Sequence, residues 1–177
     1  MGQFGTDHIR LMIASPIRIA LAVAALAAAG ALGVAFAAEW WGGLVPCALC
    51  LVERWPYRIA AALAVAGLLQ PRALARVALA LVLLTALAAA AAAAVHVGVE
   101  FGWWASPLPE CAAPRFSGGS IAERLRQMPL RPAKPCDEPI YVLAPLPVSF
   151  AQLNLLYALG VSAGVAIFLA RIPRSRP

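Results

Sequence analysis

The sequence predicts an all-α membrane protein built as a bundle of four transmembrane helices. Of the 177 residues, 63% are hydrophobic and only 12% are charged, which is too apolar for a soluble domain of this size. Three long runs contain no Asp, Glu, Lys or Arg, namely residues 19–38, 77–95 and 148–170. Each run is long enough, or nearly so, to cross about 30 Å of hydrocarbon as a helix. We therefore expect a single transmembrane domain over residues 1–177.

The charged residues are placed so that one face of the bundle is basic. Seven arginines and one aspartate flank the outer ends of the spans and give a net charge of +6, namely Asp7, Arg10, Arg18, Arg72, Arg76, Arg171, Arg174 and Arg176. The two segments on the other face carry seven basic and seven acidic residues. By the positive-inside rule the basic face, with both termini, is cytoplasmic, which requires a fourth span. The basic composition thus reflects topology, and we expect no nucleic-acid partner.

The first helix is expected at about residues 16–38. The alternative is a cleaved signal peptide, because Arg10 and Arg18 precede the apolar run and residues 35–37 have the small-x-small form of a cleavage site. The run is longer than the roughly 7–15 residues of a signal core, which favours an uncleaved helix. Its alanines and the glycines Gly30 and Gly33 predict close approach of a neighbouring helix. A short outer loop at about 39–49 follows.

The second helix is expected at about residues 50–70 and contains charges that a membrane rarely accepts. Its clean apolar stretch, 59–69, is too short to span alone, so the helix must begin near Cys50. This brings Glu53, Arg54 and Arg58 to the membrane boundary, where ionisable groups are read as functional. The alternative is that Arg54 and Arg58 only reach the lipid headgroups, with Glu53 paired to one of them, and we favour this for Arg58. Arg54 lies four residues after Cys50, on the same helix face, and is expected to be functional.

The third helix is expected at about residues 73–99 and the fourth at about 147–170. His96, near the end of the third helix, is either an interfacial polar anchor or a site residue. The long outer loop between them, about 100–146, is rich in proline. Within it, Ser120 and Glu123 have the spacing of a capping box and predict a short amphipathic helix. That helix would lie on the membrane surface or pack within the loop.

All four cysteines fall on the face opposite the basic one. They are Cys47, Cys50, Cys111 and Cys136, and the sequence leaves their three possible pairings open. Four thiolates could bind zinc, but on an oxidising side, with only His96 as a further ligand, we expect no metal. Two purely structural disulfides are a second alternative. A bridge between Cys47 and Cys50 would contribute little, because it closes a very short loop.

The third interpretation is thiol–disulfide exchange, and we favour it. A Cys-x-x-Cys pair at a helix start is next to the positive end of the helix dipole and, here, next to Arg54, both of which stabilise a thiolate. The second cysteine pair, on the proline-rich loop, could react with a soluble partner and then return to the first pair. Each such step passes through a mixed disulfide.

These residues resemble a known family. Four spans, the motif Cys47-Ala48-Leu49-Cys50-Leu51-Val52-Glu53-Arg54 in the first outer loop and a cysteine pair in the second are similar to the DsbB family of bacterial inner-membrane disulfide bond formation proteins. The Trp55-Pro56-Tyr57 continuation also looks like this family. Ser106-Pro107 and residues 136–139 fit less distinctively. The resemblance covers essentially the whole chain.

The resemblance implies a disulfide-generating thiol:quinone oxidoreductase with periplasmic cysteines. Cys111 and Cys136 would be the loop pair that oxidises a periplasmic DsbA-like thiol oxidase. Its thiolate would attack Cys111 and release Cys136, which would then engage Cys47 and free Cys50. DsbA is a strong oxidant, with a potential of about −120 mV. Its re-oxidation requires a still stronger final electron acceptor, and a membrane quinone can serve as that acceptor.

The resemblance also implies the residues that bind the quinone, either ubiquinone or menaquinone. Arg54 would hold the quinone and offset negative charge, and His96 looks like the family's quinone-proximal histidine. Two alternatives stay open. One is a non-catalytic membrane scaffold with structural disulfides, and the other is a DsbB paralogue that serves a dedicated partner.

Overall fold

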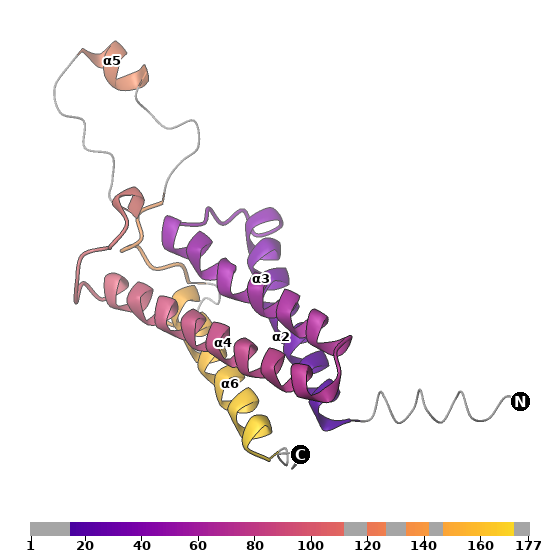
Figure 1. Ribbon diagram of the computed structural model, residues 1–177. Helices are drawn as coiled ribbons and strands as arrows, with labels where there is room; N and C mark the ends of the chain where they lie inside the picture. The colour runs from indigo at the N-terminus through magenta and orange to yellow at the C-terminus, as the bar shows by residue number, and fades with distance from the viewer. Residues whose placement is uncertain (1–14, 112–119, 127–133, 142–146, 172–177) are drawn as a thin grey trace, which may run out of the picture.

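Four long helices form the body of the protein (Figure 1). The computed structural model describes residues 15–111, 120–126, 134–141 and 147–171, and the structural statements below concern these residues. The long helices are α2 (Pro16–Trp40), α3 (Ala48–Leu68), α4 (Arg72–Glu100) and α6 (Phe150–Arg171). α3 packs on α2 and α4, and α4 also packs on α6. The described part contains no strand, only an isolated β-bridge between Tyr141 and Ser149.

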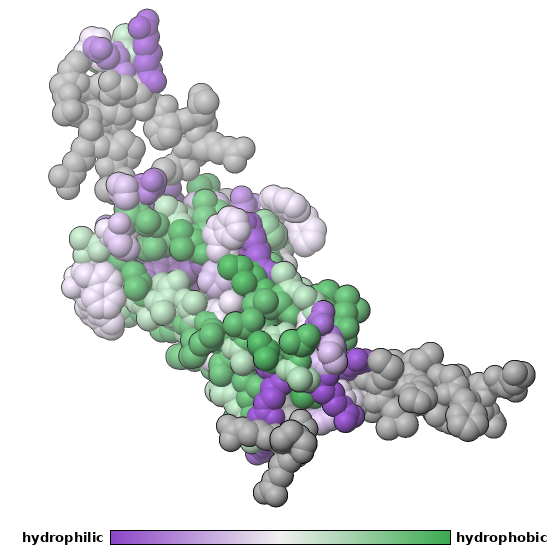
Figure 2. Space-filling model, in the orientation of Figure 1, coloured by the Kyte–Doolittle hydropathy of each residue, from purple (hydrophilic) through white to green (hydrophobic). Residues whose placement is uncertain are grey.

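Three of these helices are long and apolar enough to cross a membrane, namely α2, α4 and α6. α3 is not among them, because Glu53, Arg54 and Arg58 interrupt its apolar surface. Hydrophobic residues cover most of the visible face of the bundle (Figure 2). The prediction of an all-α membrane protein is therefore confirmed, with three candidate spans.

Basic residues gather at the end of the bundle where α2 begins and α6 ends. Arg18, Arg72, Arg76 and Arg171 occupy the first turn of α2, the start of α4 and the last residue of α6. This end is hydrophilic in the space-filling view (Figure 2). The remaining members of the predicted basic face, Asp7, Arg10, Arg174 and Arg176, lie outside the described residues.

The opposite end carries exposed tryptophans. Trp40 and Trp41 end α2, and Trp103 and Trp104 follow α4. The Trp104 indole lies over Gly98, where an added Cβ would come within 2.0 Å of the ring, and its Nε1–H donates to the Val95 carbonyl at 3.1 Å. Tryptophans at this level are typical of a membrane–water interface.

The short helix predicted in the outer loop is present as α5 (Ile121–Arg126). The Ser120 side chain caps it, since its Oγ accepts a hydrogen bond from the Glu123 backbone at 3.3 Å. α5 lies apart from the four long helices in Figure 1, and Ile121 is 78% exposed. A place for α5 on the membrane surface stays a prediction.

A close helix approach occurs at Gly67 of α3, and not at the predicted glycines Gly30 and Gly33. A Cβ at Gly30 or Gly33 would meet nothing within 4 Å, so these two residues do not mark a tight contact. At Gly67 it would lie 2.7 Å from the Ala78 Cβ of α4 and 3.1 Å from a Leu21 methyl of α2. The spacing of glycines within one helix therefore did not predict which helix face packs closely against a neighbouring helix.

We expect Gly67→Ala to destabilise the bundle by about 1–3 kcal/mol, the usual cost of overpacking a close contact. The Ala78 Cβ is fixed to the α4 backbone, so α3 and α4 would have to move apart. Thermal unfolding in detergent measures the effect. Gly33→Ala is the matched control and should be neutral or slightly stabilising, because its site is open and alanine favours helix. Equal stability of both variants would contradict the contact.

Candidate functional site

The first cysteine pair lies across the start of α3. Cys47 has an extended backbone and caps the helix, since its Sγ accepts a hydrogen bond from the Cys50 backbone N–H at 3.2 Å. The two sulfurs are 2.7 Å apart, and neither is bonded to another cysteine. Cys47 is buried and Cys50 is half-buried. The capping role explains why a Cys-x-x-Cys pair at this position brings its sulfurs together.

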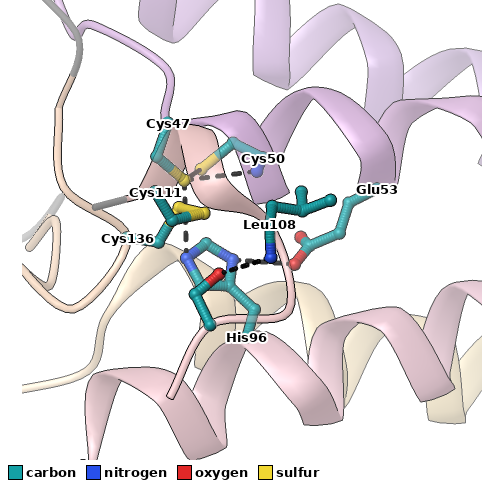
Figure 3. The surroundings of a disulfide bond; sticks show 8 residues. Cys47, Cys50, Glu53, His96, Leu108, Cys111 and Cys136 are labelled. Carbon is teal, nitrogen blue, oxygen red and sulfur yellow. Dashed lines mark hydrogen bonds and ion pairs between the residues drawn. A yellow bond between two sulfur atoms is a disulfide. The ribbon is translucent and has the colours of Figure 1, made fainter. Parts of the chain in front are cut away.

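His96 of α4 contacts the buried sulfur of this pair. Its Nε2 lies 3.5 Å from the Cys47 Sγ, and its Nδ1 lies 2.7 Å from the Glu53 carboxylate (Figure 3). Cys47 lies just outside the helix, as the residue before the first residue of α3. Its hydrogen bond with the Cys50 thiol, aided by the hydrogen bond and charge of His96, lowers the pKa of Cys47 below its ordinary value, although burial opposes this. A lowered pKa makes it easier for the Cys47 thiol to give up its proton to a neighbouring group and react as the thiolate in exchange.

Glu53 is buried, and both of its oxygens have partners. Oε1 pairs with His96, and Oε2 accepts a hydrogen bond from the Asn154 amide of α6 at 2.6 Å. The Asn154 oxygen in turn accepts from the Tyr57 hydroxyl at 2.7 Å. A carboxylate removed from water is stable only with such partners. The expectation that Glu53 pairs with an arginine is wrong in this structure.

Arg54 pairs with Glu39 instead. Its Nη1 lies 2.8 Å from the Glu39 carboxylate, and its guanidinium lies 4.9 Å from the centre of the Phe36 ring. The reason is the length of α2, which was expected to end at 38 but continues to Trp40. Glu39 therefore belongs to the last turn of α2, facing α3, rather than to the loop. Arg58 is exposed and lies over the Trp55 ring at 5.2 Å.

The second cysteine pair forms a disulfide that packs against the first. Cys111 and Cys136 are bonded, and both are buried. They share one hydrophobic cluster with Cys47, Leu49 of α3 and Val99 of α4. Figure 3 shows the disulfide beside Cys47, with His96 on the far side of that sulfur from Cys50. Two cysteine pairs that are far apart in the sequence are thus brought together at one end of the bundle.

A cavity of about 510 Å³ opens beside the first pair, between α2, α3 and α6. Its polar wall consists of Cys50, Glu53, Arg54, Tyr57 and Asn154, and the rest is mainly aliphatic. Size and lining are those of a small-molecule site, mostly apolar with a few polar groups. The described residues that line the cavity include Cys50 but not Cys47. The Cys50 side of the pair therefore faces the cavity, and Cys47 lies on the side of the Cys111–Cys136 disulfide.

The predicted site residues lie near one another, but not all in one place. Cys50 and Arg54 line the cavity, whereas His96 does not and instead contacts Cys47 and Glu53. Reasoning from the sequence missed Asn154 and Tyr57 as site residues. The only available signal was that Asn154 is an amide within the uncharged run 148–170.

The ligand atoms of Cys47, Cys50 and His96 lie within 4.8 Å of one another, among the residues described. Two cysteines and one histidine could hold a zinc ion with one open position. A disulfide between the two sulfurs would remove two of the three ligands. A resident metal and a redox-active pair therefore exclude each other at this place.

A bundle of apolar helices that brings two cysteine pairs together at one end defines a membrane protein of thiol–disulfide chemistry. The family model described as "Disulfide bond formation protein DsbB" matches residues 17–168. The chain belongs to the DsbB family, as its Cys47–Arg54 motif suggested, and is a membrane oxidoreductase of disulfide bond formation. No match was found among curated proteins or solved structures.

Proposed function

We propose that this protein is a thiol:quinone oxidoreductase that re-oxidises a soluble DsbA-like thiol oxidase and passes the electrons to a membrane quinone. One observation carries the proposal. Cys50 lines a cavity between the helices, while its partner Cys47 packs against the Cys111–Cys136 disulfide. A single cysteine pair is therefore in contact with both the electron source and the place of the acceptor.

In the proposed topology all four long helices span the bacterial inner membrane, and both termini are cytoplasmic. α3 completes the bundle because its charged residues do not need lipid contact. Glu53 and Arg54 are buried against neighbouring helices and have partners, and Arg58 can extend toward the interface. The cysteines then lie on the periplasmic side, at the level of the exposed tryptophans. Of the four, α3 is the span that this proposal adds.

The chain's residues would carry out the exchange in balanced steps. A partner thiolate attacks the Cys111 sulfur, so the bond to Cys136 breaks and Cys136 leaves as a thiolate. Cys136 attacks Cys47 in the Cys47–Cys50 disulfide, and Cys50 leaves. The partner's second thiol then releases the partner as a disulfide, and the freed Cys111 attacks Cys136 and releases Cys47.

These steps leave the loop pair as a disulfide and the first pair as a dithiol. That is the arrangement of the structure, in which Cys111 and Cys136 are bonded and Cys47 and Cys50 are free. When bound, a quinone supplies a two-electron, two-proton acceptor. The dithiol gives up two electrons and two protons and becomes the Cys47–Cys50 disulfide again.

The cavity fits a quinone in both shape and chemistry. Its aliphatic walls suit a flat ring, and Arg54 offers a buried cation to a ring oxygen. A second apolar cavity of about 500 Å³ lies between α2 and α6 and shares Tyr157 with the first. An isoprenoid tail would lie there.

The proposal is tested with purified protein, a reduced DsbA-like partner and quinone. Partner oxidation should accompany the loss of quinone absorbance, one partner disulfide for each quinone reduced. Quinone reduction by the protein's own pre-reduced Cys47–Cys50 dithiol, without oxidation of this partner, would instead favour a paralogue that serves a dedicated partner. If neither partner oxidation nor quinone reduction occurs, the protein is a scaffold.

We expect Arg54→Ala to raise the apparent KM for quinone about tenfold or more, because a buried charged hydrogen bond contributes about 1.5–3 kcal/mol. The disulfides should still form, since Arg54 contacts neither pair directly. The remaining Glu39 is partly exposed and can be solvated. Quinone titration of the initial rate measures the effect.

Arg58→Ala is the control for this variant, because Arg58 is exposed and outside the cavity lining. Its KM should equal that of the unmodified protein. Unchanged quinone kinetics in Arg54→Ala would refute the assigned role of Arg54.

A further inference from the structure

The Glu53 carboxylate connects the first cysteine pair to the cavity. On one side it contacts His96, whose other nitrogen contacts Cys47, and on the other it contacts Asn154. Glu53 itself lines the cavity, as do Asn154 and Tyr57. The three hydrogen bonds from His96 through Glu53 and Asn154 to Tyr57 are 2.6–2.7 Å long and join α4, α3 and α6.

The two sulfurs differ in how their protons can leave. Oxidation of a dithiol to a disulfide releases two protons, and reduction of a quinone takes up two. Cys50 lines the cavity, so its proton can leave there directly. Cys47 is only 3% exposed and does not line the cavity, and among the residues that the structure describes its side-chain hydrogen-bond partners are Cys50 and His96, which is also 3% exposed. The second proton therefore needs protein groups to carry it.

We propose that His96 and Glu53 carry the Cys47 proton into the cavity, and that Asn154 and Tyr57 are positioning residues that hold the Glu53 carboxylate in place. The inference rests on the proposed quinone function. The Cys47 proton passes to His96 Nε2, and the proton on His96 Nδ1 passes to Glu53 Oε1. The protonated carboxyl then donates into the cavity, so the two protons released equal the two taken up.

Asn154 and Tyr57 have separate parts in this arrangement. The Asn154 amide N–H fixes Glu53 Oε2, which leaves Oε1 directed at His96. The Tyr57 hydroxyl donates to the Asn154 oxygen, which settles the orientation of the amide so that its NH₂ group faces Glu53. The Glu53 contacts given by the described residues are to His96 and Asn154, whereas Arg54 pairs with Glu39. Loss of either residue would leave the carboxylate free to rotate.

The first test is kinetic. Asn154→Ala should lower kcat for quinone reduction about tenfold or more, part of the 10²–10⁴-fold that a positioned acid–base group contributes. KM should stay nearly constant, the reverse of Arg54→Ala. Tyr57→Phe should show a smaller loss of the same kind. Ser162→Ala is the matched control, because Ser162 is buried on the same helix, bonds only the Ala158 carbonyl and lies outside both cavities.

The second test needs no quinone. Infrared difference spectra between the disulfide and dithiol forms of the quinone-free protein should contain a carboxyl band that Glu53→Gln removes. Asn154→Ala should shift this band, and Ser162→Ala should not. An unmoved band or an unchanged kcat in Asn154→Ala would overturn the inference. If the unmodified protein instead shows the band but fails to reduce quinone, the proposed function is wrong.

Discussion

Cys50→Ser should abolish quinone reduction by this protein. Serine cannot form the disulfide with Cys47, and Cys50 is the sulfur of the pair that lines the cavity. The Cys111–Cys136 disulfide should still form, because its own bond does not involve Cys50. The measurement is quinone absorbance after addition of reduced partner, with thiol counting of the purified variant to verify the remaining disulfide.

The same variant separates an enzyme from a scaffold. Serine is close in size to cysteine, and Cys50 is only half-buried, so helix content and thermal unfolding should stay near those of the unmodified protein. Quinone reduction at the normal rate in this variant would exclude the assigned role. A scaffold with structural disulfides predicts that neither the unmodified protein nor the variant reduces quinone, and that both keep the same fold.

Cys111→Ala should separate the two halves of the reaction. Quinone should still oxidise the Cys47–Cys50 dithiol after chemical reduction, because the described residues that line the cavity all belong to α2, α3 and α6 and none to the loop. Oxidation of the DsbA-like partner should fall to the background rate, because the sulfur that the partner attacks is absent. Single-turnover quinone reduction and gel-shift analysis of partner thiols measure the two halves.

Arg126→Ala is the control for Cys111→Ala, since Arg126 is exposed on α5 and far along the loop from either cysteine. It should oxidise the partner normally. Partner oxidation at normal rates in Cys111→Ala would overturn the assignment of the loop pair.

Local sequence features predicted the helices and the membrane class well. The uncharged runs 19–38, 77–95 and 148–170 lie almost wholly within α2, α4 and α6, because a helix in lipid must be apolar along its length. The capping box at Ser120 predicted the start of α5 for a similarly local reason. The family resemblance, carried by the Cys47–Arg54 motif, is also confirmed.

Contacts between helices could not be predicted in the same way. Glu53 was expected to pair with a neighbouring arginine, but its partners come from α4 and α6, more than forty residues away. Two further contacts also depend on how the helices are arranged in space. Arg54 pairs with Glu39 because α2 continues two residues beyond its expected end, and His96 faces Cys47 rather than the cavity. Spacing along a chain does not specify how helices rotate against each other.

The close contact at Gly67 has a consequence for how a bulky lipid could come and go. It fastens α2, α3 and α4 together near the end where α3 turns into α4, whereas α2 and α6 make few contacts with each other along the cavities. Sideways separation of α2 from α6 would break the hydrogen bond from the Tyr157 hydroxyl to the Ala27 carbonyl and open a gap toward the bilayer, while the Cys47–Cys50 pair at the start of α3 and His96 of α4 stayed together. On the proposed function, we expect a quinone and its reduced product to exchange through this gap, within the plane of the membrane.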